Sequence, residues 1–304
     1  MIGTSSTDKK KIFITGSAGF VGKNLYRLLR PDYSVFGVDK TQNEFVDRAI
    51  NIRDAGRLTG LLDSFSPDVI VHLAALSNVE LCEMDQEQAF GSNILPVKEL
   101  ADWARGREVR VIFVSSDYVY DGVKGNFTEE DEENPIQYYG KTKLEAEKIV
   151  AALKHFVILR PTVIYGWDPD GMNFLMQLYR NRMNKKAMKV LNDQISNPTF
   201  VTDLCRLILK IIEAPDLNGK YNATGPESMS RYDFALRICE YMSWDKNLLI
   251  PVKTADLEQV ARRPLNNSTI SKKAYESFDF HFNDLDYNLK LIKDDINRSH
   301  PVLQ

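Results

Sequence analysis

The stretch Lys11–Gly22, KIFITGSAGFVG, is the part of the sequence that decides the fold. Its first five residues are mostly apolar and predict a buried strand, and the amphipathic residues 20–29 predict a helix. Glycines 16, 19 and 22 occupy the turn between them, where bare backbone can approach a pyrophosphate and a helix N-terminus offers free N–H groups. Three glycines alone are a weak signal, but their place between a strand and a helix predicts a dinucleotide-binding loop.

The rest of the first half repeats this alternation of strand and helix. Apolar runs rich in Val and Ile predict further strands at residues 34–38, 68–72, 109–114 and 156–160, and amphipathic stretches predict helices at residues 55–65, 86–104 and 139–153. Nearly continuous apolar strands are typical of a parallel sheet that is buried on both faces. The alternation therefore predicts an α/β fold with a Rossmann-type doubly wound parallel sheet.

The second half of the chain has a less regular pattern. After about residue 166 it predicts helices at residues 174–182, 201–213, 231–242 and 286–296. We expect residues 1–165 to form an NAD(P)-binding domain and residues 166–304 to form a smaller C-terminal α/β substrate domain beside the carboxyl ends of the strands. Some segments of the second half are expected to return to the first domain.

Composition restricts the partners of the chain. Lys and Arg number 39 against 42 Asp and Glu, so no cationic excess is present to neutralise a nucleic acid backbone. The polar N-terminus lacks an apolar core, and no apolar run approaches the roughly 18 residues that span a bilayer. The three widely spaced cysteines and four scattered histidines show no metal-ligand spacing. These features predict a cytoplasmic protein without a metal, a membrane or a nucleic acid partner.

An acidic residue follows the second predicted strand. In dinucleotide folds a carboxylate at this point binds the adenosine ribose hydroxyls and repels a 2′-phosphate. Asp39 therefore favours NAD, whereas the adjacent Lys40 leaves NADP open as the alternative.

A tyrosine and a lysine four residues apart are the candidate catalytic pair. Tyr139 and Lys143 lie on one face of the predicted helix. A nearby ammonium is expected to lower the pKa of the phenol and bring it into use as an acid or base. Ser115 and Ser116 end the fourth long strand, where such sheets place their ligands, and a hydroxyl there can bind a carbonyl oxygen. Tyr138 has no lysine at i+4, so Tyr139 is preferred.

These residues together resemble the extended short-chain dehydrogenases, and among them most closely the dTDP-4-dehydrorhamnose reductase family. The resemblance runs from about residue 12 to residue 296. Besides the glycine loop, it rests on SSDYVYDG at 115–122, YGKTKLE at 139–145, RPTVIYG at 160–166, NF at 173–174, DQ at 193–194 with NPT at 197–199, and ARRP at 261–264 with NS at 267–268. Val163 departs from the reductases, which usually carry tryptophan there.

The resemblance implies a nicotinamide cofactor that delivers hydride to C4 of a 4-keto-6-deoxy sugar on a nucleoside diphosphate. Tyr139 would donate the proton, Ser116 would bind the carbonyl oxygen, and Lys143 would hold the ribose. The implied cofactor-binding residues are Gly16, Ser17, Ala18, Gly19, Phe20, Val21, Gly22, Asp39, Lys40, Ala74, Ala75, Ser115, Tyr139 and Lys143. The implied substrate-binding residues are Asp117, Asn173, Arg263 and Asn267.

Two alternatives stay open at this stage. An NAD-dependent sugar-nucleotide 4-epimerase would use the same serine, tyrosine and lysine, and residues 76–83 resemble such enzymes. A non-catalytic binding protein is the other, because the regulatory beta subunit of methionine adenosyltransferase resembles the same reductase family. A homodimer is a further expectation, since relatives are commonly dimeric.

Overall fold

A seven-stranded parallel sheet forms the centre of the molecule in the computed structural model, which describes residues 9–299. Its order is β11-β6-β5-β4-β1-β2-β3, so the strand order reverses between β1 and β4. The strands are β1 (Lys11–Thr15), β2 (Ser34–Asp39), β3 (Arg48–Ala49), β4 (Val69–His72), β5 (Arg110–Val114), β6 (Phe156–Arg160) and β11 (Gly219–Asn222). The predicted doubly wound parallel sheet is confirmed, and its reversal point is where such sheets bind ligands.

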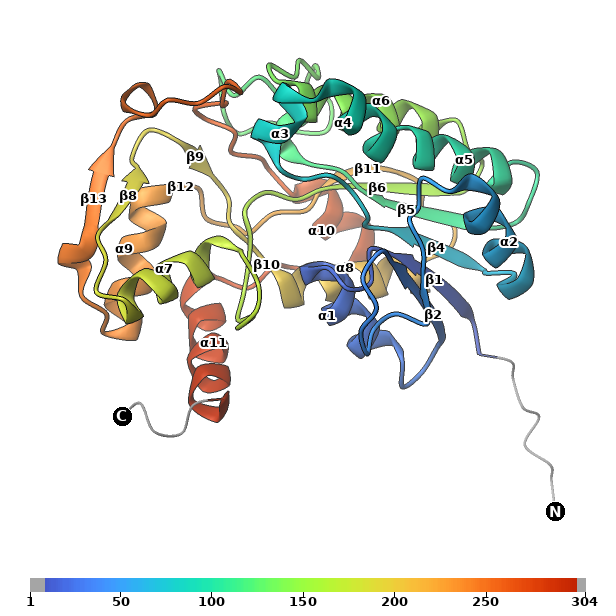
Figure 1. The fold of residues 1–304 in the computed structure, drawn as a ribbon, viewed down its shortest axis with the longest axis horizontal. Coiled ribbons are helices and arrows are strands. Elements are labelled where there is room, and N and C mark those ends of the chain that lie inside the picture. The colour runs from blue at the N-terminus through green and yellow to red at the C-terminus, as the bar shows by residue number, and fades with distance from the viewer. Residues whose placement is uncertain (1–8, 300–304) are drawn as a thin grey trace.

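Helices cover both faces of this sheet (Figure 1). One face packs against α2 (Ala55–Phe65), α5 (Leu95–Ala104) and α6 (Tyr138–Ala151). The other packs against α1 (Phe20–Leu29), α8 (Val201–Glu213) and α10 (Lys272–Phe278). Burial of both faces explains why the strands read as apolar runs.

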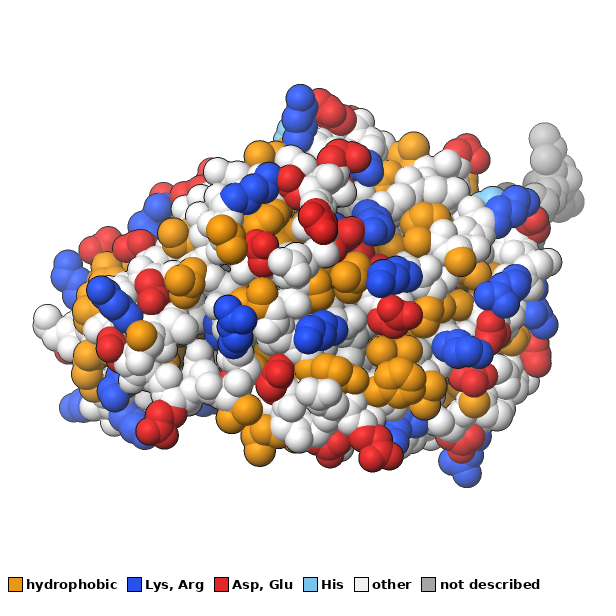
Figure 2. All heavy atoms as spheres, turned by 90° about the horizontal axis from the view of Figure 1, so that it is seen from above, with side chains coloured by type: hydrophobic (Ala, Val, Ile, Leu, Met, Phe, Trp, Pro, Cys, Tyr) orange, Lys and Arg blue, Asp and Glu red, His pale blue; other side chains and the backbone are white. Residues whose placement is uncertain are grey.

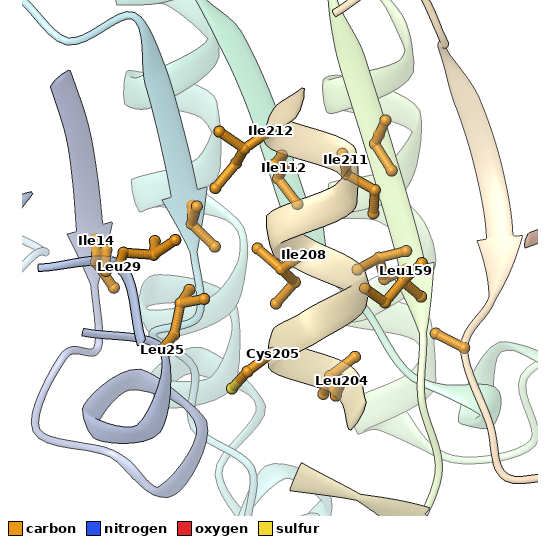
Figure 3. Close-up of a cluster of buried hydrophobic side chains, with 14 of the residues drawn as sticks. Ile14, Leu25, Leu29, Ile112, Leu159, Leu204, Cys205, Ile208, Ile211 and Ile212 are labelled. Carbon is orange, nitrogen blue, oxygen red and sulfur yellow. The ribbon is translucent and has the colours of Figure 1, made fainter. Parts of the chain in front are cut away.

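Helix α8 belongs to the second half of the sequence but lies on the sheet. Its buried residues Leu204, Ile208 and Ile211 recur at helical spacing and face the strands. Figure 3 shows this row packed among Ile112 and Leu159 of the sheet. From α8 the chain continues into β11, which pairs in parallel with β6 at the edge of the sheet.

The remaining elements form a smaller lobe around a core that includes Leu175, Phe234 and Ile238. Its helices are α7 (Phe174–Met183), α9 (Arg231–Met242) and α11 (Leu285–Ser299). Its strands form short pairs: β8 (Met188–Leu191) with β13 (Leu249–Val252), β7 (Ile164–Tyr165) with β10 (Thr199–Phe200), and β9 (Ile195–Ser196) with β12 (Met229–Ser230). The division of the chain at residues 165 and 166 stays a prediction.

Two local differences from the predicted elements lie before β5. The single helix predicted at residues 86–104 is wrong, because α4 (Gln86–Asn93) and α5 are separate helices that meet at Ile94. Pro96 has no N–H to bond the carbonyl of Ser92, which favours a break at this point. A short helix, α3 (Val79–Met84), was not predicted.

Charged side chains of both signs are interspersed on the face drawn in Figure 2. Across residues 9–299 no helix combines the length and the apolar character needed to cross a membrane.

Candidate active site

Two cavities meet at the carboxyl ends of the central strands. The first has a volume of about 530 Å³ and follows the ends of β1, β2 and β4. The second, of about 660 Å³, lies between the sheet and the smaller lobe. Ser115 and Tyr139 line both cavities, so a group bound in one can reach a group bound in the other at these residues. Both volumes are in the range of ordinary small-molecule sites.

The glycine loop forms the floor of the first cavity. Gly16 has a φ of +73°, and a Cβ at this position would lie 2.7 Å from the backbone nitrogen of Ala74. A Cβ on Gly22 would overlap the carbonyl oxygen of Gly16. The backbone therefore leaves a bare cradle at the start of α1, and this cradle fits a pyrophosphate at a helix N-terminus.

Most of the predicted cofactor residues line this first cavity. Those that do are Gly16, Gly19, Phe20, Val21, Gly22, Asp39, Lys40, Ala74, Ala75, Ser115, Tyr139 and Lys143. Ser17 and Ala18 do not: Ser17 is fully buried under the loop, and the Ala18 N–H donates to the Asp39 carboxylate at 3.3 Å. The second carboxylate oxygen of Asp39 accepts from the Thr41 N–H at 3.2 Å, so the backbone fixes this side chain at the cavity.

The N-terminus of α6 holds Tyr139, the candidate acid, in place. The side chain of Gln137 accepts from the Gly140 N–H at 2.5 Å. Glu83 of α3 accepts from the Tyr138 N–H at 2.7 Å, so the short helix that sequence patterns did not reveal caps the helix that carries Tyr139. The backbone N–H groups on either side of Tyr139 are thereby both held by side-chain oxygens.

Burial decides the protonation of the tyrosine and the lysine. It raises the pKa of Tyr139 above its ordinary value of 10, and the nearby Asp117 raises it further. The lowering that was expected from Lys143 is therefore not what the structure shows. Burial lowers the pKa of Lys143 to about 7, although Glu147 on the next turn opposes the change. The phenol is thus protonated at neutral pH, which is the state that a proton donor needs.

Ser116 lines the second cavity within a chain of hydrogen bonds. Its hydroxyl donates to Asp117 Oδ1 at 2.9 Å and accepts from the Tyr118 N–H at 3.2 Å, and Tyr139 lines the same cavity. Asn267 Nδ2 donates at 2.7 Å to both Oδ2 and the backbone oxygen of Asp117. The structure thus places Ser116 and Tyr139 together, with Asp117 behind them.

One buried hydroxyl faces the junction without a partner. Ser115 Oγ is buried, and it has no hydrogen-bond partner in the part of the chain that the structure describes. Buried polar groups are normally satisfied, so a bound molecule that spans the two cavities is the expected partner. This orphaned hydroxyl is a further observation that fits a nicotinamide cofactor at the junction.

The four predicted substrate residues lie in different surroundings. Asp117 and Arg263 line the second cavity. Asn173 instead caps α7, where it accepts from the Met176 N–H at 3.4 Å and donates to the Gly166 carbonyl at 3.1 Å. Asn267 is 2% exposed and supports Asp117 from below rather than lining the cavity.

Several residues that line the cavities were not found from the sequence. They come from separate short elements whose spacing carries no motif, so only the fold brings them together. In the first cavity they include Asn51, Arg53, Gln88 and Ser92, and in the second Gln177, Lys189, Arg231 and Gln259.

The sheet, the glycine loop and the Ser-Tyr-Lys group define the class of this protein as an extended short-chain dehydrogenase/reductase. Within that class the chain belongs to the RmlD substrate binding domain family, whose family model matches residues 10–297. The resemblance inferred from sequence motifs is thereby confirmed.

Relatives of two kinds are similar to the chain. It is 30% identical over 297 residues to a dTDP-4-dehydrorhamnose reductase of Aggregatibacter actinomycetemcomitans, covering 93% of this chain and 98% of that one. It is 28% identical to the Methionine adenosyltransferase 2 subunit beta of Xenopus tropicalis, over 80% of this chain and 75% of that one. Among solved structures, the dTDP-4-dehydrorhamnose reductase of Bacillus anthracis in complex with NADP matches with a TM-score of 0.87 and 26% identity, covering 94% and 99%.

Proposed function

We propose that this chain is an NAD(P)H-dependent reductase of a nucleotide-linked 4-keto-6-deoxy sugar, similar to dTDP-4-dehydrorhamnose reductase. The observation that carries the proposal is the complete group of Ser116, Tyr139 and Lys143 at the junction of two cavities. A reductive reaction needs a protonated acid beside the carbonyl, and the raised pKa of Tyr139 supplies one. The named reductases among the relatives support the same reading.

The first cavity would hold the cofactor, and the second the sugar. When bound, the nicotinamide supplies the hydride that C4 receives. The hydroxyl of Ser116 would turn its single proton from Asp117 to the carbonyl oxygen, and the phenol of Tyr139 would give that oxygen its proton. Lys143 would contact the nicotinamide ribose and, when charged, would stabilise the phenolate that remains. Asn267 fixes the carboxylate of Asp117, which accepts from the hydroxyl of Ser116 until a substrate is bound.

The same proposal covers the choice of cofactor. Asp39 lies at the first cavity with its carboxylate fixed by two backbone N–H groups, which favours the free ribose hydroxyls of NAD. Lys40 and Arg53 line the same cavity, and each carries a cation that suits a 2′-phosphate. We infer that both cofactors are accepted, with NAD slightly favoured. A cytoplasmic location and a homodimer stay predictions.

Absorbance at 340 nm tests the proposal directly. Purified protein would be mixed with NADH or NADPH and a dTDP-4-keto-6-deoxyhexose made in situ. Oxidation of the cofactor by the wild type, and its loss in the Tyr139→Phe variant, is the expected result. Cofactor that binds but is never oxidised would overturn the reductase and favour the epimerase or, given the relatives among methionine adenosyltransferase beta subunits, a non-catalytic protein.

A further inference from the structure

We infer that Arg231, assisted by Lys189, binds the diphosphate of the nucleotide sugar in the second cavity. The class of ligand rests on the proposed function, whereas the site itself rests on the charges of the cavity. Both residues line that cavity, Arg231 from the first position of α9 and Lys189 from β8, which packs against α9. The sequence motifs singled out neither residue.

Arg231 is a half-buried cation that forms no ion pair in the part of the chain that the structure describes. Among residues 9–299, no carboxylate lies within ion-pair distance of its guanidinium and no side-chain hydrogen bond engages it, although its charge acts at longer range on the buried Asp117. Its guanidinium lies 5.8 Å from the centroid of the Phe174 ring. Its backbone N–H donates to the Gln194 carbonyl at 3.0 Å, which fixes the main chain at the cavity wall. Five donor N–H bonds are therefore left for a ligand.

The position of Arg231 on its helix is unfavourable for a cation. It follows the N-cap residue Ser230, at the end of α9 where the helix dipole is positive. Helix stability does not explain an arginine at this point, since acidic residues are the ones stabilised there. An anion bound to Arg231 would interact favourably with the side chain and with the helix end.

Other arginines nearby have partners that Arg231 lacks. Arg237, two turns further along α9, pairs with Asp286 at 2.7 Å and with Glu227 at 3.4 Å. Arg263 lines the same cavity, but its guanidinium lies 2.6 Å from Glu80 of α3. Since Glu80 already compensates the charge of Arg263, Arg231 is the stronger attractor for an incoming anion.

The charges that line the second cavity add up in favour of an anionic ligand. Lys189 and Arg231, together with Arg263 that Glu80 compensates, share the cavity with a single carboxylate, Asp117, which is buried and hydrogen-bonded from both sides. The guanidinium fork matches two phosphate oxygens, and a lysine beside it adds a point charge. Of the parts of a nucleotide sugar, only the diphosphate always carries such a charge. A carboxylate on the sugar is the other source of the same chemistry.

Equilibrium binding without turnover tests this site. The affinities of thymidine, dTDP and UDP would be measured by calorimetry for the wild type, Arg231→Gln, Arg231→Lys and Arg263→Gln, with Arg237→Gln as a matched control on the same helix. We expect Arg231→Gln to weaken binding of the diphosphates about 10- to 100-fold, as for other charged hydrogen bonds, and to leave thymidine unchanged. The affinity of Arg231→Lys for the diphosphates should lie between those of the wild type and Arg231→Gln. Arg263→Gln should lose less affinity than Arg231→Gln, and Arg237→Gln should bind the diphosphates as the wild type does.

Three results would overturn the inference. One is a wild type that binds neither diphosphate at millimolar concentration. Another is unchanged diphosphate affinity in Arg231→Gln, or an equal loss for thymidine, which would indicate a structural effect. The third comes from a parallel titration with a nucleotide sugar that carries a uronic acid: a loss confined to that ligand would assign the cation to the sugar. These binding measurements do not depend on the reduction. If the wild type fails to oxidise NADPH but Arg231→Gln still weakens the affinity for dTDP, the proposed reaction is refuted and the diphosphate site stands.

Discussion

The ammonium nitrogen of Lys143 donates a hydrogen bond of 2.7 Å to the carbonyl oxygen of Val114. This contact joins helix α6, which carries Tyr139, to the end of β5, and the same nitrogen lies 4.3 Å from the centroid of the Phe113 ring. The charge is thus held in a nearly dry place with one carbonyl and one aromatic face as its partners. Both partners favour the ammonium form, so it is the loss of hydration on burial that lowers the pKa of Lys143 to about 7.

Replacement of Lys143 by methionine should therefore stabilise the fold, and most strongly at low pH. Because the pKa is about 7 in the folded chain and 10.5 without burial, the unfolded chain binds more protons between these values. The penalty for burying the ammonium is complete below pH 7 and disappears above about pH 10.5. We expect Lys143→Met to have a higher Tm than the wild type at pH 6, with a smaller difference at pH 9. Lys148→Met, on the exposed side of α6, serves as the control. A difference that grows from pH 6 to pH 9 would contradict the assigned shift.

Removal of the phenol oxygen should abolish turnover and spare the cofactor. Tyr139→Phe keeps the ring that touches both cavities but removes the proton donor, and such groups contribute about 10²–10⁴-fold to a rate. We expect kcat to fall by at least about 100-fold while the Kd for NADH or NADPH, from fluorescence titration, stays within about threefold. Tyr138→Phe is the matched control one residue earlier. Retention of more than about a tenth of the wild-type rate would remove Tyr139 from the role of acid.

Loss of the carboxylate at the ribose end should shift cofactor preference. Asp39→Ala removes a negative charge that lies where a 2′-phosphate would bind, and Lys40 stays beside it. We expect the ratio of kcat/KM for NADPH to that for NADH to rise by about tenfold, which corresponds to roughly 1.4 kcal/mol. Asp47→Ala, outside the cavity, should leave the ratio unchanged. The same ratio in Asp39→Ala and wild type would place Asp39 away from the ribose.

A buried ion pair beneath α6 should be essential for stability. Arg160 is fully buried and binds both carboxylate oxygens of Glu147, at 2.9 and 2.6 Å. Arg160→Met would leave Glu147 buried without its main partner, so we expect a loss of about 3–5 kcal/mol in the free energy of unfolding. The double variant Arg160→Met, Glu147→Leu should recover part of it, because no buried charge is then left unpaired. Urea denaturation measures both, and a double variant no more stable than the single one would contradict this account.

The sheet and the nucleotide loop were predictable because their signals are local. The glycines of residues 16–22 follow an apolar strand directly, and the turn needs them because a Cβ at Gly16 or Gly22 would collide with the backbone. The pair Tyr139 and Lys143 was predictable for the same reason, since helical spacing alone puts both on one face. The break at Ile94 was missed because α4 has almost no apolar face of its own and reads as a polar extension of the amphipathic α5.

The substrate side of the site was less predictable. Its strands are as short as two residues, as in β7 and β10, and such pairs carry no periodicity. No signal in the sequence marked Arg231. Arg263 has an ion-pair partner, Glu80, whereas Arg231 has none within the described chain, and only tertiary contacts decide which arginine is paired. Protonation of Tyr139 also follows from burial rather than from its neighbour Lys143.

The return of the chain through α8 to β11 limits how this protein can be cut. A fragment truncated after residue 165 would retain the glycine loop, helix α6 and six of the strands in the sheet order. It would lack the row of Leu204, Ile208 and Ile211, which covers one face of those strands, and β6 would become a bare edge. An uncovered apolar face beside an unpaired strand favours aggregation over folding. Residues 1–165 are therefore not an independently folding domain. A shortened form would need residues 201–222, either as a separate peptide or joined to its C-terminus.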